Sequence, residues 1–272
     1  MMDCISVENM RLSDAQTIQK YVPSLELMYR AADGVFRAAR WQGRVAIVVG
    51  SGNNGGDGFA LACILHRNNI PCSIFTLSRQ LSKDSAYYAT LAEAAGVPMK
   101  PFHVSCLKGY DIVVDCLLGT GFQGALRDSY HSAIQAINAS GAQVISVDIN
   151  SGMNGDTGDA ELAVRSDLTV TIGFVKNGLL TQNAGTYIKR LVCTDIGIRL
   201  AREENKICDE TQWHTLCASH GIPMTQDKAE LDGTVYYRCP GWLDLAVIKA
   251  HADQTKCSTQ FALIPLLSGG NV

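Results

Sequence analysis

The stretch Arg44-Val-Ala-Ile-Val-Val49, followed by Gly50-Ser-Gly-Asn-Asn-Gly-Gly-Asp-Gly58 and then by residues 59–69, decides the fold of this chain. Its first part is a short apolar run rich in β-branched residues, which predicts a buried strand. The glycine-rich string predicts a turn, and the apolar spacing after it predicts a helix. A strand, a glycine turn and a helix in this order begin a βαβ unit.

The same unit recurs along the chain. Before it, residues 5–40 have helical spacing, and Pro23 should separate a first helix from a second. After it, the predicted strands are 74–77, 111–116, 143–148, 168–172 and 187–194, and the predicted helices are 82–95 and 128–140. Near-continuous apolar strands that alternate with amphipathic helices indicate an α/β fold, a three-layer sandwich around a mostly parallel sheet.

The pattern decays after about Arg202. Residues 205–272 contain prolines, histidines and cysteines but no clear βα repeat. We therefore predict a main domain over 1–204 and a C-terminal extension over 205–272, which is either a small α+β appendage or a segment packed on the main domain.

Composition and charge exclude several classes of function. The chain has 272 residues, 23 Lys and Arg against 26 Asp and Glu, and 47% hydrophobic residues. No apolar run approaches the roughly 20 residues of a membrane helix, and the start has no basic and apolar signal pattern. A mildly acidic chain without a basic block is a poor nucleic-acid binder. We expect no membrane span, no secretion and no nucleic-acid partner.

The ten cysteines predict reduced thiols rather than a disulfide framework. Several of them lie inside apolar runs, and there is no C-x-x-C pair. Reduced cysteines indicate a cytoplasmic protein.

Three unusual segments follow predicted strands directly: Gly50–Gly58, Asp115–Gly121 and Asp148–Gly152. Ligands of open parallel sheets bind beyond the carboxyl ends of the strands. We therefore expect these segments to form one binding site.

The first segment contains Gly50-x-Gly52-x-x-Gly55, which is formally a dinucleotide fingerprint. A dehydrogenase that uses NAD would also place an acid after the second strand to hold the ribose. Here that strand is followed by Ser78 and Arg79. An NADP-linked oxidoreductase in which Arg79 reads the 2′-phosphate stays an alternative.

Together the segments resemble the NAD(P)HX epimerase family, also known as the YjeF N-terminal domain. The resemblance covers roughly residues 5–200. It is carried by Asn53–Gly58, Asp115–Gly121, Val147–Gly152, Asp156–Gly158, Thr169–Leu179 and Asp195–Ile198, and by Glu26–Met28.

The resemblance implies a Rossmann-like isomerase that interconverts the R and S forms of hydrated NADH or NADPH, called NADHX and NADPHX. It implies a bound potassium ion, a separate dehydratase as functional partner, and a possible homodimer. The residues implied to contact the dinucleotide are Asn53, Asn54, Gly55, Gly56, Asp57, Gly119, Thr120, Gly121, Phe122, Gln123, Gly124, Ala125 and Asp148. The implied ligands of the ion are Asn54, Asp115 and Ser151.

The chemistry of these residue types fits the resemblance. Amide, carboxylate and hydroxyl oxygens suit a hard cation. Epimerisation by loss and readdition of a hydroxyl needs a group that gives and takes a proton, and we predict Asp148 in this role. Lys176 is left out, because it could be a solvated loop lysine. Asn150 and Ser51 stand where the family usually has proline.

Simpler structural interpretations exist for each of these residues. Asn53 and Asp57 could cap a helix that begins near Gly58. Asp115 could be a structural acid paired with a backbone N–H, and Asp148 with Ser151 could form only an Asx-type turn. The whole chain could be a non-catalytic module that binds a ligand or protein on the same fold.

The cysteines and histidines of the extension could suggest zinc, but their spacing matches no standard finger. They are Cys208, His214, Cys217, His220 and Cys239. We expect them to be scattered core and surface residues.

Overall fold

A seven-stranded parallel sheet forms the centre of the computed structural model, which describes residues 1–245. In spatial order its strands are β4 (Met99–Pro101), β3 (Cys72–Thr76), β2 (Val45–Val49), β5 (Ile112–Cys116), β6 (Gln143–Val147), β7 (Leu168–Ile172) and β9 (Leu191–Thr194). The chain runs outward from β2 to β4 and then returns to β5 beside β2. The strand order therefore reverses between β2 and β5, which is where open α/β sheets bind ligands.

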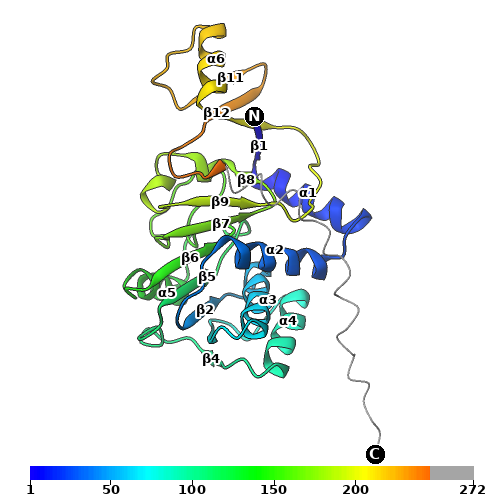
Figure 1. The fold of residues 1–272 in the computed structure, drawn as a ribbon, viewed down its shortest axis with the longest axis vertical. Helices are drawn as coiled ribbons and strands as arrows, with labels where there is room; N and C mark the ends of the chain where they lie inside the picture. The colour runs from blue at the N-terminus through cyan, green and yellow to red at the C-terminus, as the bar shows by residue number, and fades with distance from the viewer. Residues whose placement is uncertain (246–272) are drawn as a thin grey trace, which may run out of the picture.

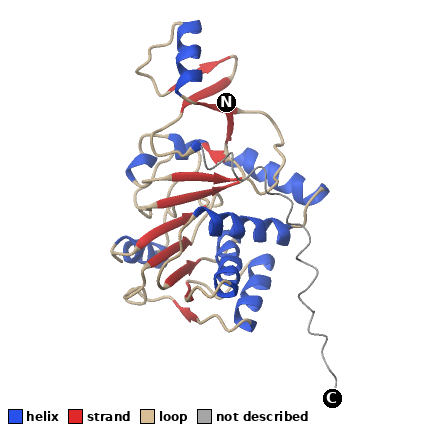
Figure 2. Ribbon diagram, in the orientation of Figure 1, coloured by secondary structure: helices blue, strands red, loops and turns tan. Residues whose placement is uncertain are grey.

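Helices cover both faces of this sheet (Figures 1 and 2). The helices of the main domain are α1 (Val7–Lys20), α2 (Ser24–Ala38), α3 (Asn53–Arg67), α4 (Lys83–Ala94) and α5 (Asp128–Asn138). Val45, Ile47 and Val49 of β2 pack into the core beneath α2, α3 and α4. Ala46 and Val48 point to the other face, beneath α5. Both faces of β2 are buried, which explains its continuous apolar sequence, and the predicted three-layer α/β class is confirmed.

The glycine-rich string is the main place where the predicted elements are wrong. We expected a turn up to Gly58, but α3 begins at Asn53 with Gly52 as its N-cap. A Cβ at Gly55 would lie 2.4 Å from the carbonyl oxygen of Gly50, and one at Gly58 would lie 2.8 Å from Val49 Cγ1. These glycines therefore let the first turns of the helix pack directly on the strand.

Two further boundaries differ from the sequence-based expectation. The predicted strand 187–194 is shorter as β9 (Leu191–Thr194), because residues 187–190 form a turn and a bend in which Ile188 makes only an isolated bridge to Ser166. At the N-terminus, a strand β1 (Met2–Ile5) precedes α1, where the sequence predicted no strand and the helical spacing began at residue 5. Strand β1 is recognised only through its pairing partners, which lie about 170 and 200 residues away.

The C-terminal extension shares a second sheet with the N-terminus (Figure 1). Its order is β11 (Lys228–Leu231), β12 (Thr234–Arg238), β10 (Asn205–Cys208), β1 and β8 (Val175–Lys176). Helix α6 (Glu210–His220) packs beside it, with a capping box at Asp209 and a left-handed Gly221 at its end. The described part of the extension contains one helix, α6, and three strands, β10, β11 and β12. The rest of the predicted extension, residues 246–272, lies outside the described residues.

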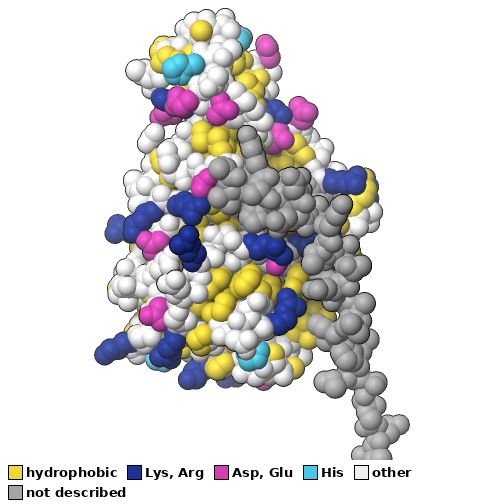
Figure 3. All heavy atoms as spheres, in the orientation of Figure 1, with side chains coloured by type: hydrophobic (Ala, Val, Ile, Leu, Met, Phe, Trp, Pro, Cys, Tyr) yellow, Lys and Arg dark blue, Asp and Glu magenta, His cyan; other side chains and the backbone are white. Residues whose placement is uncertain are grey.

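Charged side chains of both signs lie on the face drawn in Figure 3, with acidic residues around the base of the extension and Lys and Arg spread over the main domain below. None of the described helices is both long and apolar enough to cross a membrane.

Candidate active site

A cavity of about 630 Å³ lies at the carboxyl ends of the parallel strands, between α1, α2 and the segments that follow β2, β5 and β6. Most of the residues predicted to bind the dinucleotide line it. They are Asn53, Asn54, Asp57, Gly119, Thr120, Gly121, Phe122, Gln123, Ala125 and Asp148. The three motif segments therefore converge on one hollow.

The other three predicted contacts lie elsewhere. Gly55 and Gly56 are buried inside α3, where a Cβ would meet Gly50 or the side chains of Met28 and Ser85. Gly124 lines a neighbouring pocket of about 320 Å³ that shares Phe122 and Gln123 with the main cavity. Gly55 and Gly56 therefore serve the close packing of α3 and do not line the cavity.

Asp115 is the buried acid at the floor of the site. It is fully buried at the end of β5 and accepts hydrogen bonds from Ser151 Oγ (2.5 Å), Ser151 N (3.0 Å), Ser146 Oγ (3.0 Å) and Leu117 N (3.2 Å). Burial raises the pKa of the Asp115 carboxyl, and these hydrogen bonds oppose the rise. The interpretation of Asp115 as an acid paired with backbone N–H groups therefore holds alongside any ligand role.

Asn54 and Ser151 meet at Leu118, next to Asp115. Asn54 Nδ2 donates to Leu118 O at 2.9 Å, and Leu118 N donates to Ser151 Oγ at 2.9 Å. Asn54 Oδ1 is buried and has no hydrogen-bond partner among residues 1–245. A buried polar oxygen without a partner costs free energy, so it is a natural ligand position for a cation. The structure thus brings the three predicted potassium ligands together.

Asp148 follows β6 in the left-handed region, with φ of 69°. Its Oδ1 accepts from Lys176 Nζ at 2.5 Å, and its Oδ2 lies 3.4 Å from Thr120 N. A non-glycine residue with positive φ is strained and persists only where its surroundings hold it. Here the Lys176 pair and the peptide N–H of Thr120 hold the carboxylate toward the cavity.

Lys176 is the partner that the sequence-based prediction left out. Its side chain is 1% exposed, and Nζ also donates to Ile172 O (2.7 Å) and Thr171 Oγ1 (3.1 Å). A buried ammonium requires such partners. The expectation that Lys176 could be a solvated loop lysine is wrong, because β8 pairs with β1 and holds this residue inside the protein.

Three more carboxyls line the cavity: Asp14 of α1, Asp57 of α3 and Asp84 of α4. Burial raises the pKa of Asp14 above its ordinary 3.8, and the nearby Asp148 raises it further while Lys176 lowers it. Burial raises the pKa of Asp57 well above 3.8, with Asp148 and Asp14 adding to the rise. Asp14 carries no motif in the sequence, so only its place on a helix beside the cavity identifies it.

The capping interpretation of Asn53 and Asp57 is wrong, because both residues lie within α3 and neither is its N-cap. Gly52 is the N-cap and makes no side-chain bond, while Asn53 Oδ1 accepts from Ser82 Oγ at 2.8 Å. Arg79, the residue proposed for an NADP-linked oxidoreductase, is not among the residues that line the cavity.

Asn150 stands where the family usually has proline, and its side chain holds the turn by hydrogen bonds. Its Nδ2 donates to Val164 O at 2.8 Å and its Oδ1 accepts from Thr169 Oγ1 at 2.6 Å. These bonds fix the turn between Asp148 and Ser151.

In the extension, Cys208 and Cys217 pack with Trp213 in a small core, and His214 lies beside Glu210 on the surface. Within the described part of the chain, no three His, Cys, Asp or Glu side chains are placed to hold a metal ion.

The sheet order, the cavity at its switch point and the polar segments around it define a Rossmann-like α/β protein whose cavity lies at the strand ends, where such folds bind ligands. Residues 24–178 match the family model described as YjeF-related protein N-terminus. The chain belongs to this family.

Relatives of known function extend the comparison. The chain is 34% identical over 199 residues to the NAD(P)H-hydrate epimerase of Limosilactobacillus fermentum, an alignment that covers 70% of this chain and 95% of that one. It is 36% identical to the bifunctional NAD(P)H-hydrate repair enzyme Nnr of Coxiella burnetii and 34% identical to that of Archaeoglobus fulgidus, over 66% and 96% of this chain. It spans 38% and 56% of those two bifunctional enzymes.

A solved structure supports the fold. The yeast protein ynu0 superimposes with a TM-score of 0.60 over 65% of this chain and 83% of that one, at 18% sequence identity. At that identity the likeness shows the shared fold alone.

Proposed function

We propose that this chain is an NAD(P)H-hydrate epimerase, an isomerase that interconverts the R and S forms of NADHX and NADPHX. The observation that carries the proposal is the convergence of the three motif segments on one cavity, with the Asp148–Lys176 pair inside it. The Limosilactobacillus fermentum relative named above as an epimerase supports the same activity.

The dinucleotide would lie across the switch point of the sheet. Peptide N–H groups at the start of α3 and in the Gly119–Ala125 segment can face a pyrophosphate, as helix N-termini commonly do. The hydrated nicotinamide ring would then reach the charged end of the cavity, at Asp148.

Asp148 is the acid–base residue of this proposal. Epimerisation at C6 can proceed by loss and readdition of the hydroxyl, because the lone pair of the ring nitrogen stabilises the cationic ring. A carboxyl group beside the hydroxyl can exchange a proton with the oxygen. Lys176 and the Thr120 N–H fix the orientation of the Asp148 carboxyl. No conformational freedom of this group therefore has to be lost when it exchanges the proton.

We also propose that Asn54, Asp115 and Ser151 would hold a potassium ion. The buried, unpartnered oxygen of Asn54 beside the carboxylate of Asp115 fits a hard cation that takes oxygen ligands. When bound, the ion would supply positive charge next to the pyrophosphate. If the ion binds only the folded protein, replacing potassium by tetramethylammonium will lower the melting temperature of the wild type. The melting temperature of an Asn54→Leu variant will not depend on potassium.

A dehydratase acting on the S form would complete the repair, whether on a separate chain or linked as in the bifunctional relatives. We further propose a cytoplasmic location, since the cysteines of the described residues are free thiols, and a homodimer.

The test is a coupled assay. The purified protein is mixed with both epimers of NADHX and an S-specific dehydratase, and the reduced nicotinamide that forms is followed by absorbance. An epimerase allows all of the hydrate to be consumed faster than in a control without the protein. Consumption that halts at the S fraction would support a non-catalytic module, and a change in the oxidation state of the nicotinamide would support an oxidoreductase.

A further inference from the structure

Asp14 is a carboxyl of the cavity wall that no part of the proposed mechanism has used. It lies on α1 and lines the cavity together with Met10 and Arg11 of the same helix. Its side chain is half-buried, and it makes no hydrogen bond to another residue within 1–245. A carboxyl in this state can bond to a bound molecule without giving up a partner in the protein.

Helix α1 is held in place by a stripe of buried polar side chains on a neighbouring face. These side chains recur at every fourth position and are fully buried: Asn9, Ser13 and Thr17. They bond at 2.9 Å to main-chain atoms of the segment that leads into the extension, namely Arg202 O, Ala201 N and Arg199 N. The spacing of four residues keeps these bonds on one face, so α1 cannot rotate without breaking them.

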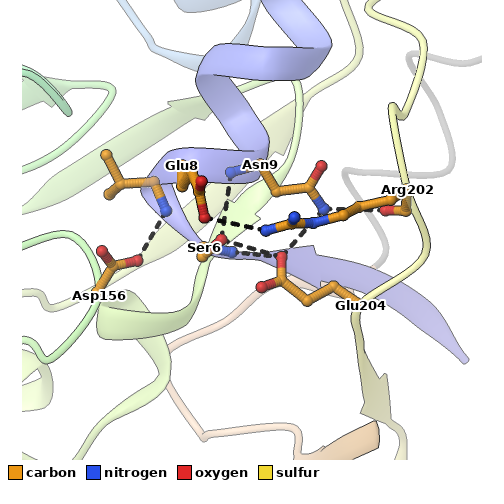
Figure 4. A network of polar contacts seen from close by, with 7 residues as sticks. Ser6, Glu8, Asn9, Asp156, Arg202 and Glu204 are labelled. Carbon is orange, nitrogen blue, oxygen red and sulfur yellow. Dashed lines mark hydrogen bonds and ion pairs between the residues drawn. The ribbon is translucent and has the colours of Figure 1, made fainter.

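The start of α1 is fixed as firmly (Figure 4). Glu204 accepts hydrogen bonds from Ser6 N (2.9 Å), Ser6 Oγ (3.1 Å) and Asn9 Nδ2 (3.0 Å), and Asp156 accepts from Val7 N at 2.7 Å. Carboxylates at a helix N-terminus satisfy its free N–H groups. The axial and rotational positions of α1 are therefore set, and with them the position of Asp14.

The two acids that share this end of the cavity have different environments. Asp148 is in an ion pair with Lys176, whereas Asp14 has no cation bonded to it among the described residues. Burial and the neighbouring Asp148 raise the pKa of Asp14. Pairs of carboxyls in unlike surroundings divide the acid and base roles of a reaction between them.

We propose that Asp14 is a second catalytic residue of the epimerase, donating the proton to the departing C6 hydroxyl from the α1 side, while Asp148 accepts the proton of the incoming water. This inference rests on the proposed function. The hydroxyl leaves as water when the C6–O bond breaks, and the nitrogen lone pair forms the C6–N double bond. Addition of water to the other face of the ring reverses these changes. The proton then returns from Asp148 to Asp14, directly or through solvent, which restores both residues.

The test compares Asp14→Asn with wild type, Asp148→Asn and the matched control Asp33→Asn, a carboxyl of α2 that pairs with Arg37 on the surface. Loss of an acid–base group lowers kcat by ~10²-fold or more, and we expect this for Asp14→Asn with a KM within about threefold. Asp33→Asn should match wild type. Circular dichroism and melting curves establish that each variant is folded.

The pH profile separates a chemical role from a structural one. The charged groups that line the cavity together with Asp14 are Arg11 of its own helix, Asp57 of α3, Asp84 of α4, Arg127 at the start of α5, Asp148 and Lys176 of β8. If protonated Asp14 is the donor, the kcat of wild type falls as the pH rises through the pKa of Asp14, and Asp14→Glu keeps this fall at a shifted pH.

The proposal would be overturned if the kcat of Asp14→Asn were within threefold of wild type. It would also be overturned if the kcat of Asp14→Glu fell at the same pH as that of wild type. If Asp14→Asn does not fold, the profile of Asp14→Glu decides the matter. If wild type and Asp14→Asn are both active as epimerases, only this inference is wrong. If wild type itself is inactive, the proposed function is wrong as well.

Discussion

At the scale of single residues, the site depends on a buried charge and its neighbours. Lys176 is almost completely buried, yet three oxygen atoms surround its ammonium group, one of them from Asp148. Both residues of the ion pair line the cavity, to which Asp14, Asp57 and Asp84 add three further carboxyls. Lys176 lowers the pKa of both Asp14 and Asp57, against the larger effect of burial.

Removing one partner of the Lys176–Asp148 pair should cost more than removing both. We expect Lys176→Met to lower the free energy of unfolding by ~3 kcal/mol, because it leaves a partly buried carboxylate without a counter-charge. The double variant Lys176→Met with Asp148→Asn should recover most of this loss. Urea unfolding of the wild type, both single variants and the double variant measures the coupling. Additive effects of the two substitutions would contradict the proposed pairing.

Asp57 should make stability depend on pH. Its pKa in the folded protein is raised by burial, so the folded state keeps a proton that the unfolded chain loses above about 3.8. Stability therefore falls as the pH rises from that value through the pKa of the folded state. Asp57→Asn removes this penalty, and we expect its melting temperature at pH 8 to exceed that of wild type by ~2–4 °C. Below pH 3.8 the difference should vanish, and an unchanged difference across the range would contradict the mechanism.

At the scale of elements, α3 and α1 are each held partly by contacts other than packed apolar side chains. In α3 these contacts are close approaches at glycines, and in α1 they are hydrogen bonds of buried polar side chains. The first turns of α3 approach the end of β2 through glycine positions, so the helix places no side chain of its own at these points of contact. Helix α1 joins the rest of the molecule through Asn9, Ser13 and Thr17, whose hydrogen bonds are all to main-chain atoms or nearby polar groups. Both helices border the cavity, so the closeness of their packing sets its shape.

Gly55→Ala should disturb the contact between α3 and β2. The added Cβ would lie 2.4 Å from the carbonyl oxygen of Gly50, a backbone atom that cannot move aside easily. We expect a loss of ~1–3 kcal/mol in the free energy of unfolding, as for an overpacked core. The control is Gly121→Ala, where no atom lies within 4 Å of the added Cβ, and its effect should stay within ~0.5 kcal/mol. Equal effects would show that the close approach is unimportant.

At the scale of the whole molecule, the two ends of the described chain are joined. Strand β1 lies between β8, which carries Lys176, and β10 of the extension. The extension also contacts the main domain through Trp242, whose Nε1 donates to Leu179 O at 3.0 Å, and through the Arg190–Asp244 ion pair. The predicted division at residue 204 therefore separates two parts of one continuous sheet, and it stays a prediction.

The extension should nevertheless open as a local unit. Its core of Cys208, Trp213 and Cys217 is separate from the two cores of the main sheet, while Ile207 and Leu243 of the extension pack with main-domain residues in a further cluster. Trp213→Ala leaves a cavity that should cost ~3–5 kcal/mol, and this loss should be confined to the extension. Hydrogen exchange should then speed up in α6, β11 and β12, while amides of β2 and β5 keep their protection. Loss of protection in β2 and β5 as well would show a single cooperative unit.

Much of this molecule could be read from local patterns. The run at Val45–Val49 and its later counterparts predicted the parallel sheet, because a strand buried on both faces must be apolar throughout. The segments after the strands predicted the cavity, since the carboxyl ends of parallel strands meet at one edge. Both inferences use only neighbours in the chain and a general rule of parallel sheets.

Tertiary structure alone decided the remainder. Lys176 is buried because β8 pairs with β1, Asp14 faces the cavity because residues 199–204 hold α1, and the glycine string is helical because it packs on β2. In each case the deciding partner lies far away in the sequence or is a backbone atom without a side-chain signature. Local periodicity reports which face of an element is buried, but only the assembled fold determines which distant residues meet there.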